Sequence, residues 1–330
     1  MKIVILGFGE VTGTWTNPQW MAHSLSKFNH EVLYFNPPAT RDIKASDLRR
    51  IAKRVINRNA INSTLINFGV KSSYMSNSFP FKVFNSLFQR SLLDAIENAD
   101  LVICFQSVWL QYFDYLKYKE KLVFFVCDDY SALKDSKDNQ VQFDRAMVDL
   151  GSPIFVTHPL LLNFYSKSVL MENCIPSYLY EGNKLTSFKK SSGQVCFVGT
   201  LHAEKIDFEL VNKVVKDNPE KQFHFAGKLF GIELADLPNT SNFIYHGELS
   251  FDSAMKLAQE SEFGLIPFKE NEYTSAVFSM KYFEYISAFC QPVVTCLPMY
   301  KSLSKEIRPR RFLTSSDTNL NNYTLSETDK

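Results

Sequence analysis

Short apolar runs rich in β-branched and aromatic residues alternate with longer amphipathic segments along most of the chain. This alternation is typical of parallel sheets whose strands are joined by crossover helices. We therefore predict an α/β chain of two doubly wound, Rossmann-like domains facing one another across a cleft. The predicted strands are KIVILG (2–7), EVLYFN (31–36), DLVICF (100–105), KLVFFVC (121–127), PIFVT (153–157), QVCFVG (194–199), KQFHFAG (221–227), NFIYHG (242–247), EFGLIPF (262–268) and QPVVTC (291–296).

The segment YLYEGNKLTSFKKSSG (178–193) interrupts this pattern, because it loses the apolar rhythm and gains Gly, Ser and Lys. A length of 330 residues also suits two domains. We predict a first domain over 1–178, a linker over 179–193 and a second domain over 194–300. Residues 301–330 are polar and weakly patterned, which predicts a frayed or truncated tail.

The overall charge excludes some classes of partner. The formal net charge is +1, whereas proteins that bind nucleic acid usually carry a marked basic excess. The six cysteines form no CxxC pair, and Cys104, Cys127, Cys196 and Cys296 lie in or beside apolar runs. This predicts buried thiols in a reducing compartment, no zinc site and no other metal site.

No apolar run approaches the roughly 18 residues that a membrane-spanning helix needs. The N-terminal MKIVILGFG is too short for the core of a signal peptide and is read as the first strand. We expect a cytoplasmic protein whose membrane contact, if any, is peripheral.

Ligands bind outside the carboxyl ends of the strands in an open parallel sheet, so the residues after each predicted strand are candidates for a site. In the first half these residues are Gly9, Gln106, Asp128, Asp129 and His158. In the second half, Gly199-Thr200 and Gly227-Lys228 occupy the same position.

The glycines after the first strand suggest a competing hypothesis, a dinucleotide site. Gly7, Gly9 and Gly13 form GxGxxxG, one residue longer than the dinucleotide fingerprint. That site also requires an acid after the second strand, and this strand ends in Asn36. The pattern favours a loop that a ligand can approach over a bound dinucleotide.

Asp128 and Asp129 are adjacent carboxylates at the end of a buried strand. One of them could act as a general base that takes a proton from an attacking hydroxyl. The alternative is that one of them caps the following segment. Which of the two would be the base stays open.

The segment NEYTSAVFSMKYFEYI (271–286) predicts a helix capped by Ser279, with Lys281 in its first turn. A cation there opposes the helix dipole, unless an anion occupies the same helix end. A diphosphate would satisfy both the free N–H groups and the ammonium. Glu284 lies on the same face and could accept from ribose hydroxyls; the alternative is a plain surface pair of Lys281 with Glu284.

Several segments resemble the motifs of bacterial GT-B glycosyltransferases, including teichuronic-acid-type transferases and, more distantly, the xanthan glucuronosyltransferase. The segment NEYTSAVFSMKYFEYISAFCQPVV is similar to their donor-site motif, and GTWTNPQWMAHSLSKFNHEVLYFNPP (13–38) resembles their N-terminal signature. VCDDYSAL (126–133), IFVTHPLL (154–161) and FVGTLHAEKIDFEL (197–210) resemble further segments in the same order.

This resemblance implies a cytoplasmic hexosyltransferase that takes a sugar from a nucleotide-diphosphate donor, most commonly UDP, without a metal or other cofactor. It implies inversion with Asp128 or Asp129 as base, and a saccharide or polyprenyl-linked acceptor in surface polysaccharide synthesis. The implied donor-site residues are Gly199, Thr200, Thr274, Ser279, Met280, Lys281 and Glu284. The implied acceptor-side residues are Gly9, Trp15, Gln106 and His158.

The sequence also departs from the family pattern. The E-x7-E motif of retaining enzymes would place Glu at 276, where Ala276 stands. The usual A-G-K-P-V-V turn is replaced by Ala288-Phe289-Cys290-Gln291-Pro292, which is one residue longer and has no glycine. Both differences weaken the retaining interpretation. The C-terminal helix that usually crosses back to the first domain is not evident either.

Two alternative functions fit the same architecture, a nucleotide-sugar 2-epimerase and a non-catalytic partner of another transferase.

One region of the first half could contact a membrane. The basic stretch Arg41–Lys71 precedes SFPFKVFNSLFQR (78–90), in which Phe81, Phe84 and Phe88 share a helical face. Basic residues beside an apolar face are typical of segments that lie on anionic lipid. We expect the Phe stripe to pack on the first-domain core, and the protein as a whole to contact the membrane peripherally.

Overall fold

In the computed structural model, the described residues are 1–9, 11, 15–37, 69–71, 81–127, 138–165, 167–173, 191–275, 277–303, 305 and 308–323. The chain divides into two compact units, Met1–Glu172 and Asn173–Lys330. Most of the predicted linker, residues 179–190, lies outside the described residues, and the first strand of the second unit begins at Ser191. This strand therefore starts three residues earlier than the sequence predicted.

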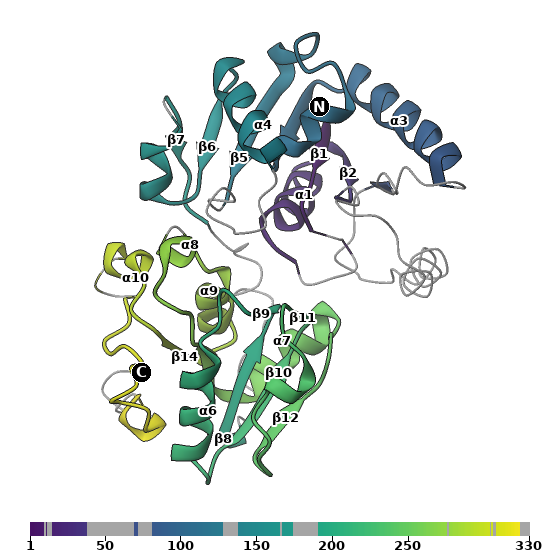
Figure 1. Ribbon diagram of the computed structural model, residues 1–330. Coiled ribbons are helices and arrows are strands. Elements are labelled where there is room, and N and C mark those ends of the chain that lie inside the picture. Colours follow the sequence, from purple (N-terminus) through teal and green to yellow (C-terminus); the bar gives the residue numbers. More distant parts are fainter. Residues whose placement is uncertain are drawn as a thin grey trace. The chain divides into compact units, whose positions relative to one another are not determined.

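The first unit is a parallel sheet with helices (Figure 1). Its described strands follow the order β3-β2-β1-β4-β5-β6-β7. They are β1 (Lys2–Leu6), β2 (Glu31–Phe35), β3 (Gly69–Lys71), β4 (Leu101–Cys104), β5 (Leu122–Val126), β6 (Ile154–Val156) and β7 (Val169–Leu170). The described helices are α1 (Asn17–Lys27), α3 (Phe81–Glu97) and α4 (Asp138–Asp149), and 3-10 turns span Ser107–Tyr112, Lys119–Lys121 and Pro159–Asn163.

The predicted strands of the first unit are confirmed, since β1, β2, β4, β5 and β6 lie within the predicted runs. Their apolar side chains form the core, and Ile5, Val102 and Phe124 are completely buried. The edge strands β3 and β7 were not predicted. Each has only two or three residues, too few to show the alternation of a strand.

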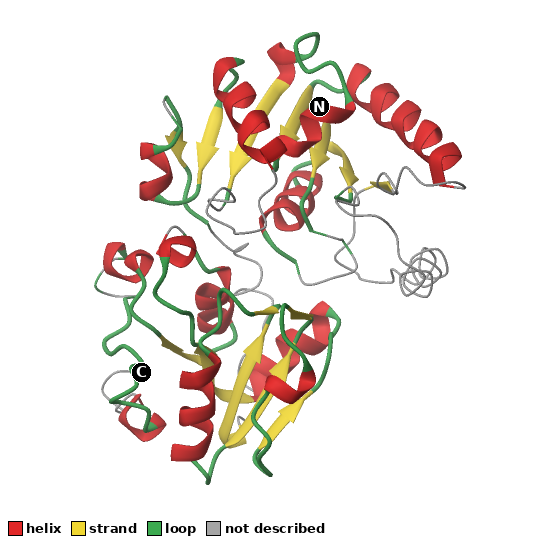
Figure 2. Cartoon of the chain, in the orientation of Figure 1, coloured by secondary structure: helices red, strands yellow, loops and turns green. Residues whose placement is uncertain are grey.

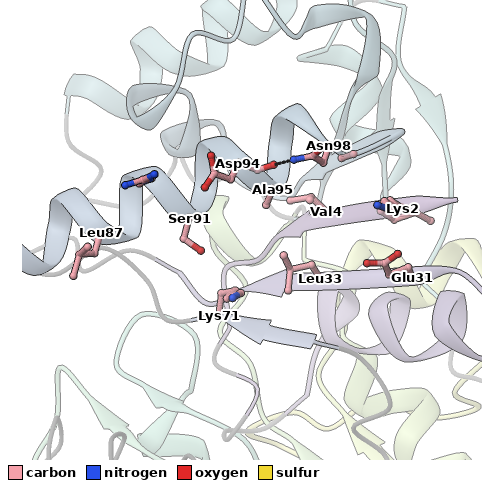
Figure 3. Close-up of a pocket in the computed structure, with 13 residues that line it drawn as sticks. Lys2, Val4, Glu31, Leu33, Lys71, Leu87, Ser91, Asp94, Ala95 and Asn98 are labelled. Carbon is pink, nitrogen blue, oxygen red and sulfur yellow. Dashed lines mark hydrogen bonds between the residues drawn. The ribbon is translucent and has the colours of Figure 1, made fainter.

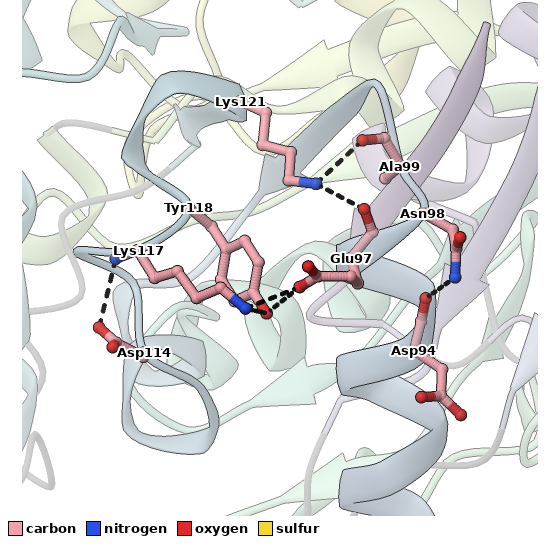
Figure 4. A network of polar contacts seen from close by, with 8 residues as sticks. All are labelled: Asp94, Glu97, Asn98, Ala99, Asp114, Lys117, Tyr118 and Lys121. Atoms are coloured by element: carbon pink, nitrogen blue, oxygen red, sulfur yellow. Dashed lines mark hydrogen bonds and ion pairs between the residues drawn. The ribbon is translucent and has the colours of Figure 1, made fainter.

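The end of α3 is fixed by a group of polar residues on the surface (Figure 4). The Lys121 ammonium donates to the carbonyl oxygens of Glu97 (2.9 Å) and Ala99 (3.1 Å). It thereby satisfies carbonyls that a helix end leaves without partners. The Glu97 carboxylate accepts from Lys117 (3.0 Å) and Tyr118, and these hydrogen bonds hold the pKa of Glu97 below its usual value.

The second unit contains a parallel sheet of order β12-β10-β8-β13-β14 and a small sheet of β9 and β11 (Figure 2). Its strands are β8 (Ser191–Val198), β9 (Leu201–His202), β10 (Gln222–Ala226), β11 (Leu229–Phe230), β12 (Phe243–Tyr245), β13 (Ser261–Ile266) and β14 (Gln291–Val294). The helices are α6 (Phe208–Asp217), α7 (Phe251–Glu260), α8 (Glu272–Ser275), α9 (Met280–Ser287) and α10 (Pro298–Ser302), with 3-10 turns at Leu234–Asp236 and Leu320–Tyr323.

The predicted strands of the second unit are also confirmed, and so is the helix predicted after Ser279, which is α9. The helix α6 shows how the sequence sets these bounds. Asp207 precedes its first residue and accepts from the Leu210 N–H at 2.9 Å, which is the bond of an N-cap. Val211, Val214 and Val215 follow at helical spacing and are completely buried.

The expectation of a frayed polar tail is wrong for residues 308–323. Leu313, Leu320 and Tyr323 belong to the buried core of the second unit. The Leu313 N–H donates to the Val294 carbonyl at 2.7 Å. The buried Asn218 at the end of α6 donates to the Thr318 carbonyl (2.8 Å) and accepts from the Leu320 N–H (2.8 Å). Single buried apolar residues and the hydrogen bonds of Asn218 therefore attach this segment to the core of the second unit.

Other predictions are confirmed only in part. Cys104, Cys127 and Cys196 are buried free thiols, whereas Cys296 is half-buried. Phe88 is buried against Phe35, with ring centroids 6.1 Å apart, so it packs on the core as expected. The side chains of Phe81 and Phe84, and the basic stretch up to position 68, lie outside the described part. None of the helices described is both long enough and apolar enough to cross a membrane.

Candidate functional site at the carboxyl edge of the second unit

The strand order of the second unit predicts where a ligand-binding crevice lies at the carboxyl ends of its strands. From β8 the chain proceeds to β10 and β12 on one side, and β13 and β14 lie on the other side. The winding direction therefore reverses between β8 and β13. At such a switch point the loops on either side diverge and leave a crevice that binds ligands.

Gly199 follows β8 directly, and Gly227 follows β10. Their φ angles of +143° and +146° are rarely adopted by residues with a side chain. The Gly199 N–H donates to the Ala226 carbonyl at 2.8 Å. A Cβ added at Gly227 would lie 1.8 Å from the Gly199 carbonyl oxygen. Glycine is thus required at 227 because the Gly199 backbone occupies the place of a Cβ, and it is favoured at 199 by the φ angle.

Lys281 reaches this strand end from α9. A Cβ added at Gly199 would lie 2.1 Å from the Lys281 Cε and 2.6 Å from its Nζ. The lysine side chain therefore occupies the space that a side chain at 199 would fill. The two residues that the sequence assigned to the diphosphate are in direct contact.

The N-terminus of α9 lies beside this lysine, and its cap differs from the prediction. Ser279 occupies the N-cap position, but its side chain makes no capping hydrogen bond, so the predicted cap is wrong. Ser279 is buried, and its N–H donates to the Met299 sulfur at 3.0 Å. Hence no capping hydroxyl competes with an anion for the first-turn N–H groups.

Glu284 follows Lys281 by three residues and is half-buried with it and with Met280. Burial raises the pKa of the Glu284 carboxyl, and the positive charge of Lys281 lowers it. The two residues are three positions apart and interact electrostatically, so they lie on one face of α9, as predicted. Their half-buried surroundings differ from those of an exposed surface pair.

Thr274, which the resemblance assigned to the donor site, has a side chain that closes a loop. The residue is completely buried. Its hydroxyl donates to the Lys269 carbonyl and accepts from the Asn271 N–H at 3.0 Å, and the Asn271 side chain accepts from the Thr274 N–H at 2.8 Å. The N-x-x-T motif thus closes a turn after β13. Thr200, in contrast, is exposed after Gly199.

Two side chains that the sequence analysis missed hold this loop in place. Lys269 donates to the Ala203 carbonyl and Asn271 donates to the Glu204 carbonyl, each at 2.8 Å. These bonds join the loop after β13 to the loop after β9. The sequence could have indicated the role of Asn271, because Asn and Thr at this spacing favour turns. No sequence pattern indicates the role of Lys269.

The first unit has a corresponding switch point between β1 and β4. Gly9 follows β1 and Gln106 follows β4, and both are half-buried. A Cβ at Gly7 would lie 2.0 Å from the Tyr34 hydroxyl oxygen, and one at Gly9 would lie 2.4 Å from Nε2 of Gln19. Neighbouring side chains therefore leave no room for a Cβ at either glycine.

Asn36 stands where a dinucleotide site would have its acid. Its side-chain oxygen accepts from the Val11 N–H at 3.0 Å and so holds the loop after β1. The Tyr34 hydroxyl donates to the Gly9 carbonyl in the same loop at 2.6 Å. Both hydrogen bonds fix the path of the loop after β1.

Trp15 and His158, which the resemblance placed on the acceptor side, are both buried and make contacts within the first unit. Trp15 is buried, donates from Nε1 to the Val11 carbonyl (3.0 Å) and packs edge-on against Trp20. His158 is buried and accepts at Nδ1 from the Leu160 N–H (3.2 Å), and burial lowers its pKa. Asp128 and Asp129 lie outside the described residues.

A surface hollow of about 510 Å³ in the first unit lies elsewhere (Figure 3). It lies between α3 and the strands β1 to β3, and Lys2 and Glu31 line it at the amino ends of β1 and β2. It is therefore not the crevice at the carboxyl edge. Among the described residues, no group of three or more His, Cys, Asp or Glu side chains could hold a metal ion.

No protein-family model and no curated protein matches the sequence. Solved structures do match. HepE from Anabaena, in complex with UDP and glucose, aligns over 95% of this chain and 85% of its own, with 12% identity and a TM-score of 0.60. AviGT4, a glycosyltransferase involved in avilamycin A biosynthesis, aligns over 93% of this chain and 82% of its own, with 8% identity and a TM-score of 0.57. With two doubly wound parallel sheets and these matches, the chain has the GT-B glycosyltransferase fold.

Proposed function

We propose that the protein is a glycosyltransferase that moves a sugar from a nucleotide-diphosphate donor, most commonly a UDP-sugar, to an acceptor hydroxyl. The observation that carries this proposal is the contact of Lys281 with Gly199 at the switch point of the second unit. The Lys281 ammonium contacts the residue after β8, and the N–H groups of Met280 and Lys281 begin the same helix. Together they offer a diphosphate a full charge and directed donors.

In the proposed reaction, Asp128 or Asp129 takes the proton from the acceptor hydroxyl. The acceptor oxygen then attacks the anomeric carbon, and the bond from that carbon to the donor diphosphate breaks. Lys281 stabilises the negative charge that develops on the leaving nucleoside diphosphate. Glu284 accepts from the ribose hydroxyls. This reaction inverts the anomeric centre and uses no metal.

The residue roles follow the sequence resemblance to teichuronic-acid-type and xanthan-type transferases. Met280 contributes the backbone N–H group beside Lys281, Ser279 precedes it at the N-cap position, and Thr200 lies at the phosphate side after Gly199. Gly9 and Gln106 border the acceptor side. We propose a saccharide or lipid-linked acceptor of surface polysaccharide synthesis, at the inner face of the cytoplasmic membrane.

Calorimetric titration with UDP, GDP and dTDP tests the donor site. We expect the wild type to bind UDP most tightly, and Lys281→Met to weaken UDP binding by about 10- to 100-fold because one charge-assisted contact is lost. Methionine keeps a stem across Gly199 and removes only the charge. Lys216→Ala, which removes an exposed lysine in the last turn of α6, is the matched control. Equal UDP affinity in the wild type and Lys281→Met would remove the lysine from the site.

The chemistry needs a separate test, an NMR assay with a UDP-sugar in the presence and absence of acceptor. Turnover that requires acceptor and is abolished by Asp128→Asn with Asp129→Asn supports the transferase. Turnover without acceptor indicates an epimerase. Unchanged transfer in the double variant, with donor still bound, indicates a non-catalytic partner.

Peripheral membrane contact is tested with anionic vesicles. Because Phe88 packs inward, the contact we propose relies on the basic stretch Arg41–Lys71. We expect co-sedimentation with phosphatidylserine vesicles that disappears at about 1 M salt, where charges are screened beyond about 3 Å. Equal recovery in the pellet with neutral vesicles would contradict this contact.

A further inference from the structure

The tyrosine Tyr285 joins α9 to the end of β8. Its side chain is buried, with 1% of its surface exposed. Its hydroxyl oxygen accepts a hydrogen bond from the Val198 N–H at 3.0 Å. Val198 is the last residue of β8 and directly precedes Gly199. The hydroxyl therefore contacts the backbone immediately before the strand end that Lys281 covers.

The position of Val198 in the sheet explains why its N–H bonds to a side chain and not to a neighbouring strand. The pairing of β8 with β13 extends from Ser191 to Cys196, which lies opposite Gly264. Val198 comes two residues later, so its N–H meets the tyrosine hydroxyl in place of a carbonyl of β13. The hydroxyl thus substitutes for a strand partner where the two strands of the switch point diverge.

The ring of Tyr285 lies against Gly264 in the middle of β13. A Cβ added at Gly264 would lie 2.3–2.6 Å from three ring carbons. The ring therefore fills the place of a side chain on this strand and fixes how closely α9 approaches the sheet. Burial also raises the pKa of the phenol well above its usual value, so the group stays neutral at physiological pH.

Lys281 precedes Tyr285 by four residues on α9, so both lie on the same side of the helix. A change in the position of Tyr285 moves Lys281 relative to Gly199. We propose that Tyr285 is a positioning residue that sets the distance between the Lys281 ammonium and the end of β8, and so tunes the affinity for a nucleoside diphosphate. This inference rests on the proposed function of the site.

The test compares UDP with uridine, because only UDP carries the phosphates that Lys281 would hold. We expect Tyr285→Phe to weaken UDP binding by about 5- to 10-fold, the effect of one hydrogen bond, and to leave uridine binding within about twofold. Phenylalanine keeps the ring over Gly264, which avoids the cavity that alanine would leave.

Tyr282→Phe is the matched control, since Tyr282 is a second buried tyrosine on α9 and packs on Tyr300, with ring centroids 5.1 Å apart. We expect it to leave the ratio of UDP to uridine affinity unchanged. Gly264→Ala, which pushes the ring by its added Cβ, should lower that ratio as Tyr285→Phe does.

The outcomes separate this inference from the proposed function. A wild type that binds no nucleoside diphosphate overturns both. A wild type that binds UDP through Lys281, with the same ratio of affinities in Tyr285→Phe, overturns only the positioning role. Equal weakening of UDP and uridine in Tyr285→Phe also overturns it, because that result indicates a general structural effect.

Discussion

The Lys281 ammonium lies against the α-carbon of Gly199, where a Cβ would be only 2.6 Å from Nζ. Gly199 directly follows β8 and Lys281 lies in the first turn of α9, and β8 and β13 diverge beside them. Only glycine leaves room for the lysine to cross this strand end. The contact therefore connects the need for glycine at position 199 with the position of the Lys281 charge at the candidate donor site.

Replacement of Gly199 tests this link directly. Gly199→Ala introduces a Cβ against Lys281 at a φ of +143°. We expect a loss of about 1–3 kcal/mol in the free energy of unfolding from the strained backbone, and weaker UDP binding because the lysine is displaced. Thermal unfolding and UDP titration measure the two effects.

Gly193→Ala is the control for this variant. Gly193 lies in the same strand, has a φ of +83°, and an added Cβ would make only an ordinary contact at 3.7 Å. We expect lower stability with unchanged UDP affinity. Unchanged UDP affinity in Gly199→Ala as well would contradict the link between the glycine and the lysine.

The turn after α9 contains a residue in a costly conformation. Phe289 has a φ of +53° and 58% of its surface exposed. A side chain in this left-handed region costs roughly 1–2 kcal/mol, and glycine costs roughly 0.5–1 kcal/mol in chain entropy. We therefore expect Phe289→Gly to stabilise the protein by about 0.5–1 kcal/mol, as measured by urea denaturation.

Asn29 provides the comparison for this prediction. It follows α1 with a φ of +62°, and asparagine tolerates this conformation better than phenylalanine does. Asn29→Gly should gain less stability than Phe289→Gly. An equal or larger gain for Asn29→Gly would show that the cost at Phe289 is not conformational.

The buried hydroxyl of Thr274 should matter for stability and little for ligand affinity. Thr274→Val leaves the Asn271 N–H and the Lys269 carbonyl without this partner, so we expect a loss of about 1–3 kcal/mol in the free energy of unfolding. Thr274→Ser should keep most of that stability. If Thr274→Val keeps its stability and loses UDP affinity, Thr274 contacts the donor after all.

Glu284 predicts a dependence of stability on pH. Its pKa is raised in the folded protein, so the fold favours the protonated form. The stability linked to this group is therefore largest below the unfolded pKa of about 4.3 and falls as pH rises through the folded pKa. Glu284→Gln removes the charge, so the variant should be more stable than the wild type at pH 7.

The difference in stability between Glu284→Gln and the wild type should shrink as the pH falls through the raised pKa of the folded protein, because the wild-type carboxyl then takes up a proton. Thermal unfolding at several pH values measures it. A constant difference across this range would show that the carboxyl does not titrate with a raised pKa.

The sequence predicted those features that depend on local pattern. The long apolar runs predicted the strands of both cores, which are β1, β2, β4, β5, β6, β8, β10, β12, β13 and β14. Lys281 was predicted as a site residue because a cation in the first turn of a helix opposes the helix dipole unless an anion binds there. Gly199 was predicted because it follows a strand. Both inferences use neighbouring residues only, and the structure places the two residues in contact.

The features that the sequence did not predict depend on contacts between distant segments. The role of Tyr285 requires the register of β8 against β13, which no local pattern contains. The packing of Gln19 against Gly9 likewise joins residues ten positions apart and is not visible as a local pattern. Leu313 and Leu320 are buried singly among polar residues, so no periodicity marks them.

The central claim is that Lys281 and the start of α9 hold a diphosphate at the end of β8. A crystal structure of the protein with UDP tests it most directly. We predict a phosphate oxygen about 2.8 Å from the Lys281 Nζ and the diphosphate beside Gly199. UDP bound elsewhere, or bound with Lys281 directed away from its phosphates, would contradict the account.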